Sequence, residues 1–219
     1  MKVINFDLQK TLLSQYMLEL RDKDLQQDRM RFRANLERIG EIISYEISKT
    51  LEYHEVNVNT PLGVARCNAL DHNVVLGTIL RAGLPFHQGF LRYMDSAENA
   101  FVSAYRKYKE KDTDNFDIHI EYIASPSIEG KTLILVDPML ATGSSMELSY
   151  RALLTKGTPG RLILASVIAS QQAVDYLQSK FPDDSVTLYV AAIDSEINAH
   201  KYIVPGLGDA GDLAFGVKD

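Results

Sequence analysis

Short apolar runs and amphipathic stretches alternate along the chain from residue 74 onward. The runs apolar enough to form strands buried on both faces of a sheet are residues 74–80, 100–105, 133–136, 161–169 and 186–193. Helical spacing follows several of them, most clearly after residue 145 and over residues 171–181. This alternation is typical of a mostly parallel sheet flanked by helices, so the pattern predicts an α/β fold.

The N-terminal part, about residues 1–52, has helical periodicity. Residues 11–20 place their apolar side chains on one helical face, and a longer helix is predicted from about residue 24 to residue 51. No catalytic chemistry is evident in these helices, and we expect them to cover the sheet or to pack on a partner subunit. Residues 54–58 then alternate as in a short edge strand or hairpin before a turn at 61–63.

A strongly charged segment, residues 106–115, separates the strand at 100–105 from an alternating run at 118–122. Two strands joined by such a tip predict a protruding β-hairpin at about 101–125. A charged tip of this kind is found in simple solvated hairpins, and also in mobile flaps that close over a site and exclude water. The residues alone leave both interpretations open.

The segment most suggestive of chemistry is residues 131–145, where a buried strand ends at Asp137 and Pro138 and a small, hydroxyl-rich loop leads into a helix. Ser144 or Ser145 is predicted as the N-cap of that helix. Such a loop can bind phosphate through backbone N–H groups and the helix dipole, and Asp137 is placed to accept from sugar hydroxyls or to contact a metal. The segment matches neither a P-loop nor a dinucleotide-binding fingerprint, and an ordinary strand–helix turn is the alternative.

Two other segments contain candidate ligand-binding residues. Arg81 follows the strand at 74–80 and precedes a helix, so it is placed to face an anion at the carboxyl edge of the sheet. Residues 198–216 form a glycine-rich stretch that we expect to be an irregular loop able to bind a flat polar ring through its backbone. Asp209 and Asp212 in that loop are weak evidence for a metal site.

Composition narrows the class of protein. The 219 residues suffice for a single domain spanning 1–219. The formal net charge of −6 argues against a nucleic-acid surface, although a few local arginines can still bind a small anion. There is no run of about 18 apolar residues and no apolar leader, so we expect a cytoplasmic protein with no membrane association. One cysteine, Cys67, leaves no internal disulfide and no Cys-based metal site.

Three separated segments together resemble one enzyme family. Residues 79–84 read Ile-Leu-Arg-Ala-Gly-Leu, residues 136–143 read Val-Asp-Pro-Met-Leu-Ala-Thr-Gly, and residues 202–212 read Tyr-Ile-Val-Pro-Gly-Leu-Gly-Asp-Ala-Gly-Asp. They are similar to segments of the uracil phosphoribosyltransferases, which are type I phosphoribosyltransferases, and the resemblance extends over roughly residues 12–217. The chain departs from the usual family residues at Thr78, Pro85, Ser144 and Leu213.

This resemblance implies transfer of the 5-phosphoribosyl group from phosphoribosyl-pyrophosphate to uracil, giving UMP and pyrophosphate in pyrimidine salvage. It implies Mg²⁺ carried by the substrate rather than a metal site in the protein. It also implies a flap carrying Arg106, a homodimer or higher homo-oligomer, and the option of a GTP effector. The residues implied for phosphoribosyl-pyrophosphate are Arg81, Arg106, Asp137, Pro138, Met139, Leu140, Ala141, Thr142, Gly143, Ser144, Ser145 and Asp209. Those implied for uracil are Ile203, Gly208, Asp209 and Ala210, and the implied catalytic residues are Asp137, Asp209 and Arg106.

Two alternatives remain at this level. The departures at Pro85 and Leu213 leave room for a phosphoribosyltransferase that uses another nucleobase. Ser144, and the departure of the residues after Arg106 from the family's usual Asn-Glu-Glu-Thr, leave room for a non-catalytic protein that senses phosphoribosyl-pyrophosphate or UMP. Retention of Arg81, Asp137 and Asp209 argues for the enzyme, since a sensor has no need to keep every group.

Overall fold

The computed structural model describes the backbone of residues 1–109 and 112–217. It describes the side chains of these residues except for those of 104–119. Its core is a mostly parallel sheet with the strand order β1-β10-β9-β7-β4-β5-β6, in which β8 also pairs with β9. Within this sheet, as far as the structure describes the chain, β5 and β6 are the only neighbours that pair antiparallel. The strands are β1 (Lys2–Asn5), β4 (Val74–Leu80), β5 (Glu98–Lys109), β6 (Asp112–Ala124), β7 (Thr132–Val136), β8 (Met139–Leu140), β9 (Arg161–Ser170) and β10 (Thr187–Asp194). The predicted α/β fold class is confirmed.

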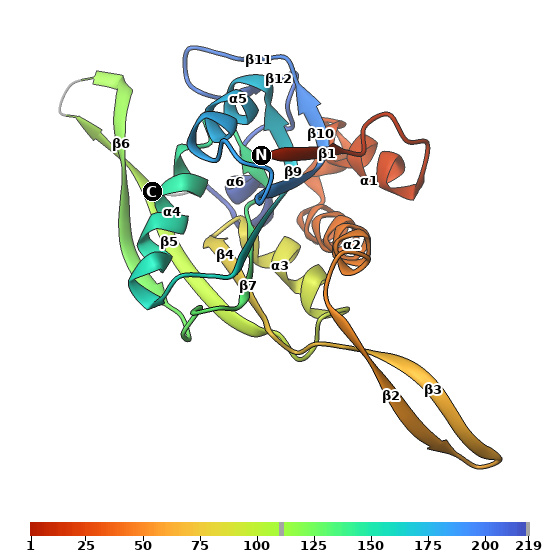
Figure 1. Cartoon of the computed structure of the whole chain (residues 1–219). Coiled ribbons are helices and arrows are strands. Elements are labelled where there is room, and N and C mark those ends of the chain that lie inside the picture. The colour runs from red at the N-terminus through yellow and green to blue at the C-terminus, as the bar shows by residue number, and fades with distance from the viewer. Residues whose placement is uncertain (110–111, 218–219) are drawn as a thin grey trace.

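Strand β7 shows why the sequence has continuous apolar runs. Leu133 and Leu135 pack into one hydrophobic cluster, while Ile134 and Val136 pack into the other, on the opposite face. The first cluster includes residues of α4 (Ser144–Leu153) and α5 (Gln171–Lys180). The second includes residues of α1 (Leu12–Arg21), α2 (Arg29–Ser48), α3 (Gly83–Leu91) and α6 (Ala210–Phe215). Both faces of the sheet are therefore covered by helices (Figure 1).

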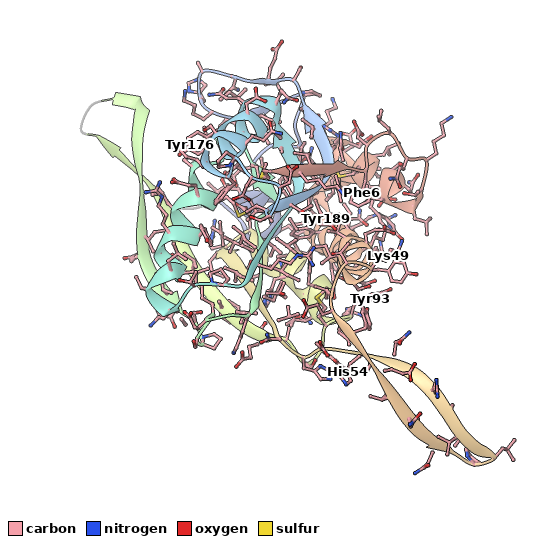
Figure 2. All side chains as sticks on the ribbon, in the orientation of Figure 1. Phe6, Lys49, His54, Tyr93, Tyr176 and Tyr189 are labelled. Atoms are coloured by element: carbon pink, nitrogen blue, oxygen red, sulfur yellow. The ribbon has the colours of Figure 1, made fainter. Side chains whose placement is uncertain are left out.

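The N-terminal part differs from the prediction in two ways. The helix expected from residue 24 is interrupted: a short 3-10 helix, η1 (Leu25–Gln27), comes first, and α2 begins at Arg29 because the Asp28 carboxylate caps the N–H of Arg31. Strand β1 was not predicted; it pairs in parallel with β10 at the sheet edge. Just after β1, the ring of Phe6 stacks on Tyr189 of β10 with centroids 6.4 Å apart (Figure 2).

Two hairpins extend from the body of the protein (Figure 1). The first consists of β2 (Tyr53–Thr60) and β3 (Gly63–Leu70), so the short edge strand predicted at 54–58 is one side of a longer antiparallel pair. The second is formed by β5 and β6 in the region where the sequence predicted a flap. Close to the C-terminus, β11 (Glu196–Ile197) and β12 (Ile203–Val204) form a small separate sheet.

The longest helix of the described residues is α2, with 20 residues. It is amphipathic, since residues such as Leu36 and Ile39 are buried while charged residues lie between them. None of the helices in residues 1–109 and 112–217 combines the length and apolar character that crossing a membrane requires.

Candidate active site

Arg81 and Asp137 lie at the carboxyl ends of neighbouring strands. Strands β4 and β7 pair in parallel, with Thr78 opposite Val136, so both chains leave the sheet at the same edge. The peptide bond between Leu80 and Arg81 is cis. Asp137 is buried; its N–H donates to the Ala165 carbonyl at 3.1 Å, and its carboxylate accepts from the Met139 N–H at 3.4 Å. Ligands of open parallel sheets bind at such an edge.

The loop after Asp137 is held to β9 along its first part. Met139 and Leu140 form β8, which pairs with β9, and the Pro138 carbonyl accepts from the Ile168 N–H at 3.0 Å. The Leu140 side chain is fully packed in the core, so a ligand can meet this residue only through its backbone. At the end of β9 the Ser170 hydroxyl donates to the Ala141 carbonyl at 2.6 Å. These contacts fix the position from which the hydroxyl-rich turn begins.

The turn into α4 corrects the predicted N-cap. Gly143, rather than Ser144 or Ser145, is the N-cap residue, with φ +77° in the left-handed region. Ser144 is the first helical residue and is not among the residues with positive φ, so a side chain at this position carries no backbone strain. Its hydroxyl lies 2.7 Å from that of Thr142. Among the described residues no side chain caps this terminus, which leaves the first N–H groups of α4 available to an anion.

The glycine-rich C-terminal segment is more ordered than an irregular loop. After β12, a cis Val204–Pro205 bond and a tight turn lead to α6, whose N-cap is Asp209; its carboxylate accepts from the Asp212 N–H at 3.0 Å. Gly208 and Asp209 are exposed, whereas the side chains of Ile203 and Ala210 are buried in the core. The predicted base-binding residues thus include two that offer a ligand mainly their backbone.

All three sequence segments meet at this edge of the sheet. The Ala210 N–H donates to the sulfur of Met139 at 3.3 Å, which joins the C-terminal segment to the loop after β7. The guanidinium of Arg81 donates to the Asp212 carboxylate at 3.3 Å, which joins the same segment to the end of β4. Within the described part of the chain, the buried Nε of Arg81 has no hydrogen-bond partner. The site is therefore continuous across segments that lie up to 131 residues apart.

Asp212 lies among the candidate site residues, although in the sequence it was only a weak metal candidate. Its partner, Arg81, is more than a third exposed, so the ion pair is open to competition from a bound anion. The only signal in the sequence was a carboxylate three residues after Asp209 in a segment rich in glycine.

Arg106 is placed only in part. Its backbone lies in β5, where it pairs with Ile118 of β6, but its side chain lies outside the described residues. The predicted contact between this arginine and a substrate is thus a prediction only. The strand itself continues the sheet next to β4, the strand that ends at Arg81.

Comparison with known proteins identifies the family. A sequence model for uracil phosphoribosyltransferase matches residues 8–217. The chain belongs to the uracil phosphoribosyltransferase family. A protein of Porphyromonas gingivalis named uracil phosphoribosyltransferase is 61% identical over 218 residues, which cover 100% of both chains. One of the same name from Pyrococcus furiosus is 39% identical over 93% of this chain and 86% of its own. A solved structure of an Aquifex aeolicus protein superposes with a TM-score of 0.84 at 31% identity, covering 98% of this chain and 99% of the other.

The structure accommodates Pro85 and Leu213, two of the departures from the usual residues of the uracil phosphoribosyltransferase family. Pro85 is the third residue of α3, where a backbone N–H has no partner inside the helix, so proline is tolerated there. Leu213 packs its side chain partly against the core. A cavity of about 300 Å³ beside Leu213 and Asp209 is also lined by Arg29, the first residue of α2. Arg29 therefore brings a cation to the side of the loop where Leu213 departs from the usual family residue.

Proposed function

We propose that the chain transfers the 5-phosphoribosyl group from phosphoribosyl-pyrophosphate to uracil, forming UMP and pyrophosphate. The observation that carries the proposal is the meeting of three segments at one edge of the sheet: Arg81 at the end of β4, the loop that leads from Asp137 into α4, and the segment around Asp209. Membership of the family supports the same activity.

The 5′-phosphate binds at the N-terminus of α4. Uncapped N–H groups in its first turn, the hydroxyls of Thr142 and Ser144, and the dipole of a ten-residue helix all favour an anion there. The left-handed Gly143 directs the backbone into this turn. Residues 141–145 are thus the phosphate-binding part of the predicted set, while Met139 and Leu140 hold the loop on β9.

The pyrophosphate group is held by Arg81 and Arg106. In the structure described here Arg81 is paired with Asp212 at 3.3 Å, a long contact for a charge-assisted hydrogen bond. A pyrophosphate carries more negative charge than one carboxylate, so it competes for the Arg81 guanidinium when the substrate enters. The hairpin carrying Arg106 closes over the substrate, which excludes water from the reaction.

Asp137 and Asp209 act on the sugar. Positive charge builds on the ribose as pyrophosphate leaves the anomeric carbon, and no side-chain nucleophile is required; positioning and electrostatic stabilisation supply the rate enhancement. Asp137, fixed at the end of β7, holds the ribose hydroxyls, and Asp209 reaches the same substrate from the opposite loop.

We propose that Mg²⁺ enters the site bound to phosphoribosyl-pyrophosphate. Among the described residues, no group of three or more His, Cys, Asp or Glu side chains is placed to hold a metal ion. Mg²⁺ usually keeps several waters and binds through one or two carboxylates plus substrate phosphates, and Asp137 and Asp209 offer such carboxylates. When bound, the ion neutralises charge on the leaving pyrophosphate.

Uracil is recognised by the backbone of residues 208–210. The N–H of Ala210 donates to the Met139 sulfur, which is a weak acceptor, so a uracil carbonyl that replaces it gains a stronger hydrogen bond. Cytosine presents an amino group where uracil presents a carbonyl. Its donor would meet a backbone donor and leave buried groups unpaired, which discriminates strongly between the bases.

Turnover of uracil, cytosine, hypoxanthine and orotate with phosphoribosyl-pyrophosphate and Mg²⁺ tests the base assignment. We expect kcat/KM for uracil to exceed that of the other bases by orders of magnitude. A higher kcat/KM for another base than for uracil would mean that the backbone of residues 208–210 selects that base instead. Binding of phosphoribosyl-pyrophosphate with no turnover of any base would favour a sensor.

A further inference from the structure

A half-buried ion pair lies behind the candidate base loop, outside the groups that the proposed reaction uses. Arg21 is the last residue of α1 and Asp194 the last residue of β10. The two guanidinium nitrogens of Arg21 donate to the two carboxylate oxygens of Asp194 at 2.7 and 2.8 Å. The Asp194 side chain is only 7% exposed, and that of Arg21 26%.

The same two side chains hold both backbone polar groups of Gly206. The Gly206 N–H donates to Asp194 Oδ2 at 2.8 Å, and the Gly206 carbonyl accepts from Arg21 Nη1 at 3.0 Å. Gly206 has φ +63°, and a Cβ on it would lie 2.1 Å from the Ile203 carbonyl oxygen. The backbone position of Gly206, two residues before Gly208, is therefore tightly fixed.

The ion pair stays charged throughout the neutral range. Burial disfavours the charged carboxylate, but the hydrogen bonds from Arg21 and from the Gly206 N–H outweigh it and lower the pKa of Asp194 below its ordinary 3.8. A buried ion pair is a costly way to gain stability, because a well-packed apolar pair often does as well. What the pair adds here is a fixed position for a backbone segment.

We propose that Arg21 and Asp194 are positioning residues that hold the backbone of residues 208–210 in register with uracil while touching neither substrate. The inference rests on the proposed assignment of that backbone to the base. A displacement of about 1 Å in a positioning group can cost on the order of a hundredfold in rate. Loosening of Gly206 should therefore weaken uracil binding. It should affect the phosphate loop much less, because β9 holds that loop separately.

The experiment compares Asp194→Asn with wild type in the full chain, measuring kcat, the KM for each substrate, and the melting temperature. The asparagine keeps the shape of the side chain but loses the charge that binds Arg21. We expect the KM for uracil to rise about tenfold or more, with little change in the KM for phosphoribosyl-pyrophosphate. Arg21→Lys keeps the charge without the two-pronged geometry, and we expect a smaller rise in the KM for uracil.

Glu19→Gln is the matched control. Glu19 lies on the same helix, is also buried, and accepts from two nitrogens of Arg31 at 2.8 Å, so its loss disturbs α1 without touching Gly206. We expect a lower melting temperature for Glu19→Gln with an unchanged KM for uracil. If Asp194→Asn and Arg21→Lys both keep the wild-type KM for uracil, or if Glu19→Gln raises it as much, the inference is overturned.

Gly208→Ala separates this inference from the base assignment on which it rests. Gly208 has φ +88°, so a side chain there strains the loop at the proposed uracil contact itself. A raised KM for uracil in Gly208→Ala, with none in the Arg21 and Asp194 variants, would refute the positioning role alone. An unchanged KM in Gly208→Ala would instead count against the proposed base site. If Asp194→Asn does not fold, Arg21→Lys alone decides the positioning role.

Discussion

Replacing Gly143 by alanine tests the geometry of the phosphate loop. Gly143 is in the left-handed region at φ +77°, which costs a residue with a side chain roughly 1–2 kcal/mol. An added Cβ would lie 3.1 Å from the Ala173 carbonyl oxygen and from side-chain atoms of Tyr176 and Leu177 on α5. That spacing is tighter than ordinary van der Waals contact, so α5 or the loop must shift by a few tenths of an ångström.

We expect Gly143→Ala to lower the free energy of unfolding by about 2 kcal/mol. For a chain of this length, that corresponds to a fall in melting temperature of about 4–8 °C. The shift also moves the first turn of α4, so the KM for phosphoribosyl-pyrophosphate should rise. Thermal unfolding of the free protein and initial rates at varied phosphoribosyl-pyrophosphate measure the two effects independently.

Ser144→Gly is the matched control for Gly143→Ala. Ser144 has no positive φ, so glycine relieves no strain there, and in the free protein the variant loses only the contact with the Thr142 hydroxyl. Ser144→Gly should lower the free energy of unfolding by less than about 1 kcal/mol. The reasoning is refuted if Gly143→Ala keeps the wild-type melting temperature and KM, or if Ser144→Gly lowers the melting temperature more than Gly143→Ala does.

Three further predictions concern single side chains. Asp137→Asn should weaken sugar binding and lower kcat, and unchanged steady-state kinetics would remove Asp137 from the site. Arg106→Ala should raise the KM for phosphoribosyl-pyrophosphate more than that for uracil; equal effects would argue against a flap contact. The hydrogen bond from Arg31 lowers the pKa of Glu19 from 4.5 to about 2, so the stability this carboxylate contributes is complete above pH 4.5 and is lost as pH falls toward 2. Urea unfolding across that range should show a weaker pH dependence for Glu19→Gln, and identical curves would contradict the assignment.

The central strands could be predicted from sequence because a strand buried on both faces is a continuous apolar run. Residues 74–80, 133–136, 161–169 and 186–193 all lie in strands of the sheet apart from residue 186, which immediately precedes β10. Strand β1 was not predicted because it has only four residues. It is a strand because it pairs with β10, which lies more than 180 residues away in the sequence. The helical periodicity after residue 24 is continuous in the sequence, so it did not reveal that α2 begins only at Arg29. That start depends on a single capping carboxylate, that of Asp28.

The positions of the candidate site residues were predictable where they depend on strand ends and loops. Arg81 and Asp137 lie at one edge because parallel neighbouring strands place their carboxyl ends together. The N-cap of α4 was mispredicted because serine is a common cap, whereas this turn requires the left-handed conformation that glycine adopts. The contacts that Asp212 and Arg21 make were not predictable, since they join positions 131 and 173 residues apart and leave no local pattern.

Uracil-dependent release of pyrophosphate from phosphoribosyl-pyrophosphate and Mg²⁺, with the nucleotide product identified, tests the central claim most directly. The account predicts stoichiometric UMP and pyrophosphate, with neither formed when uracil is omitted. Tight binding of phosphoribosyl-pyrophosphate without any UMP in the presence of uracil would contradict it.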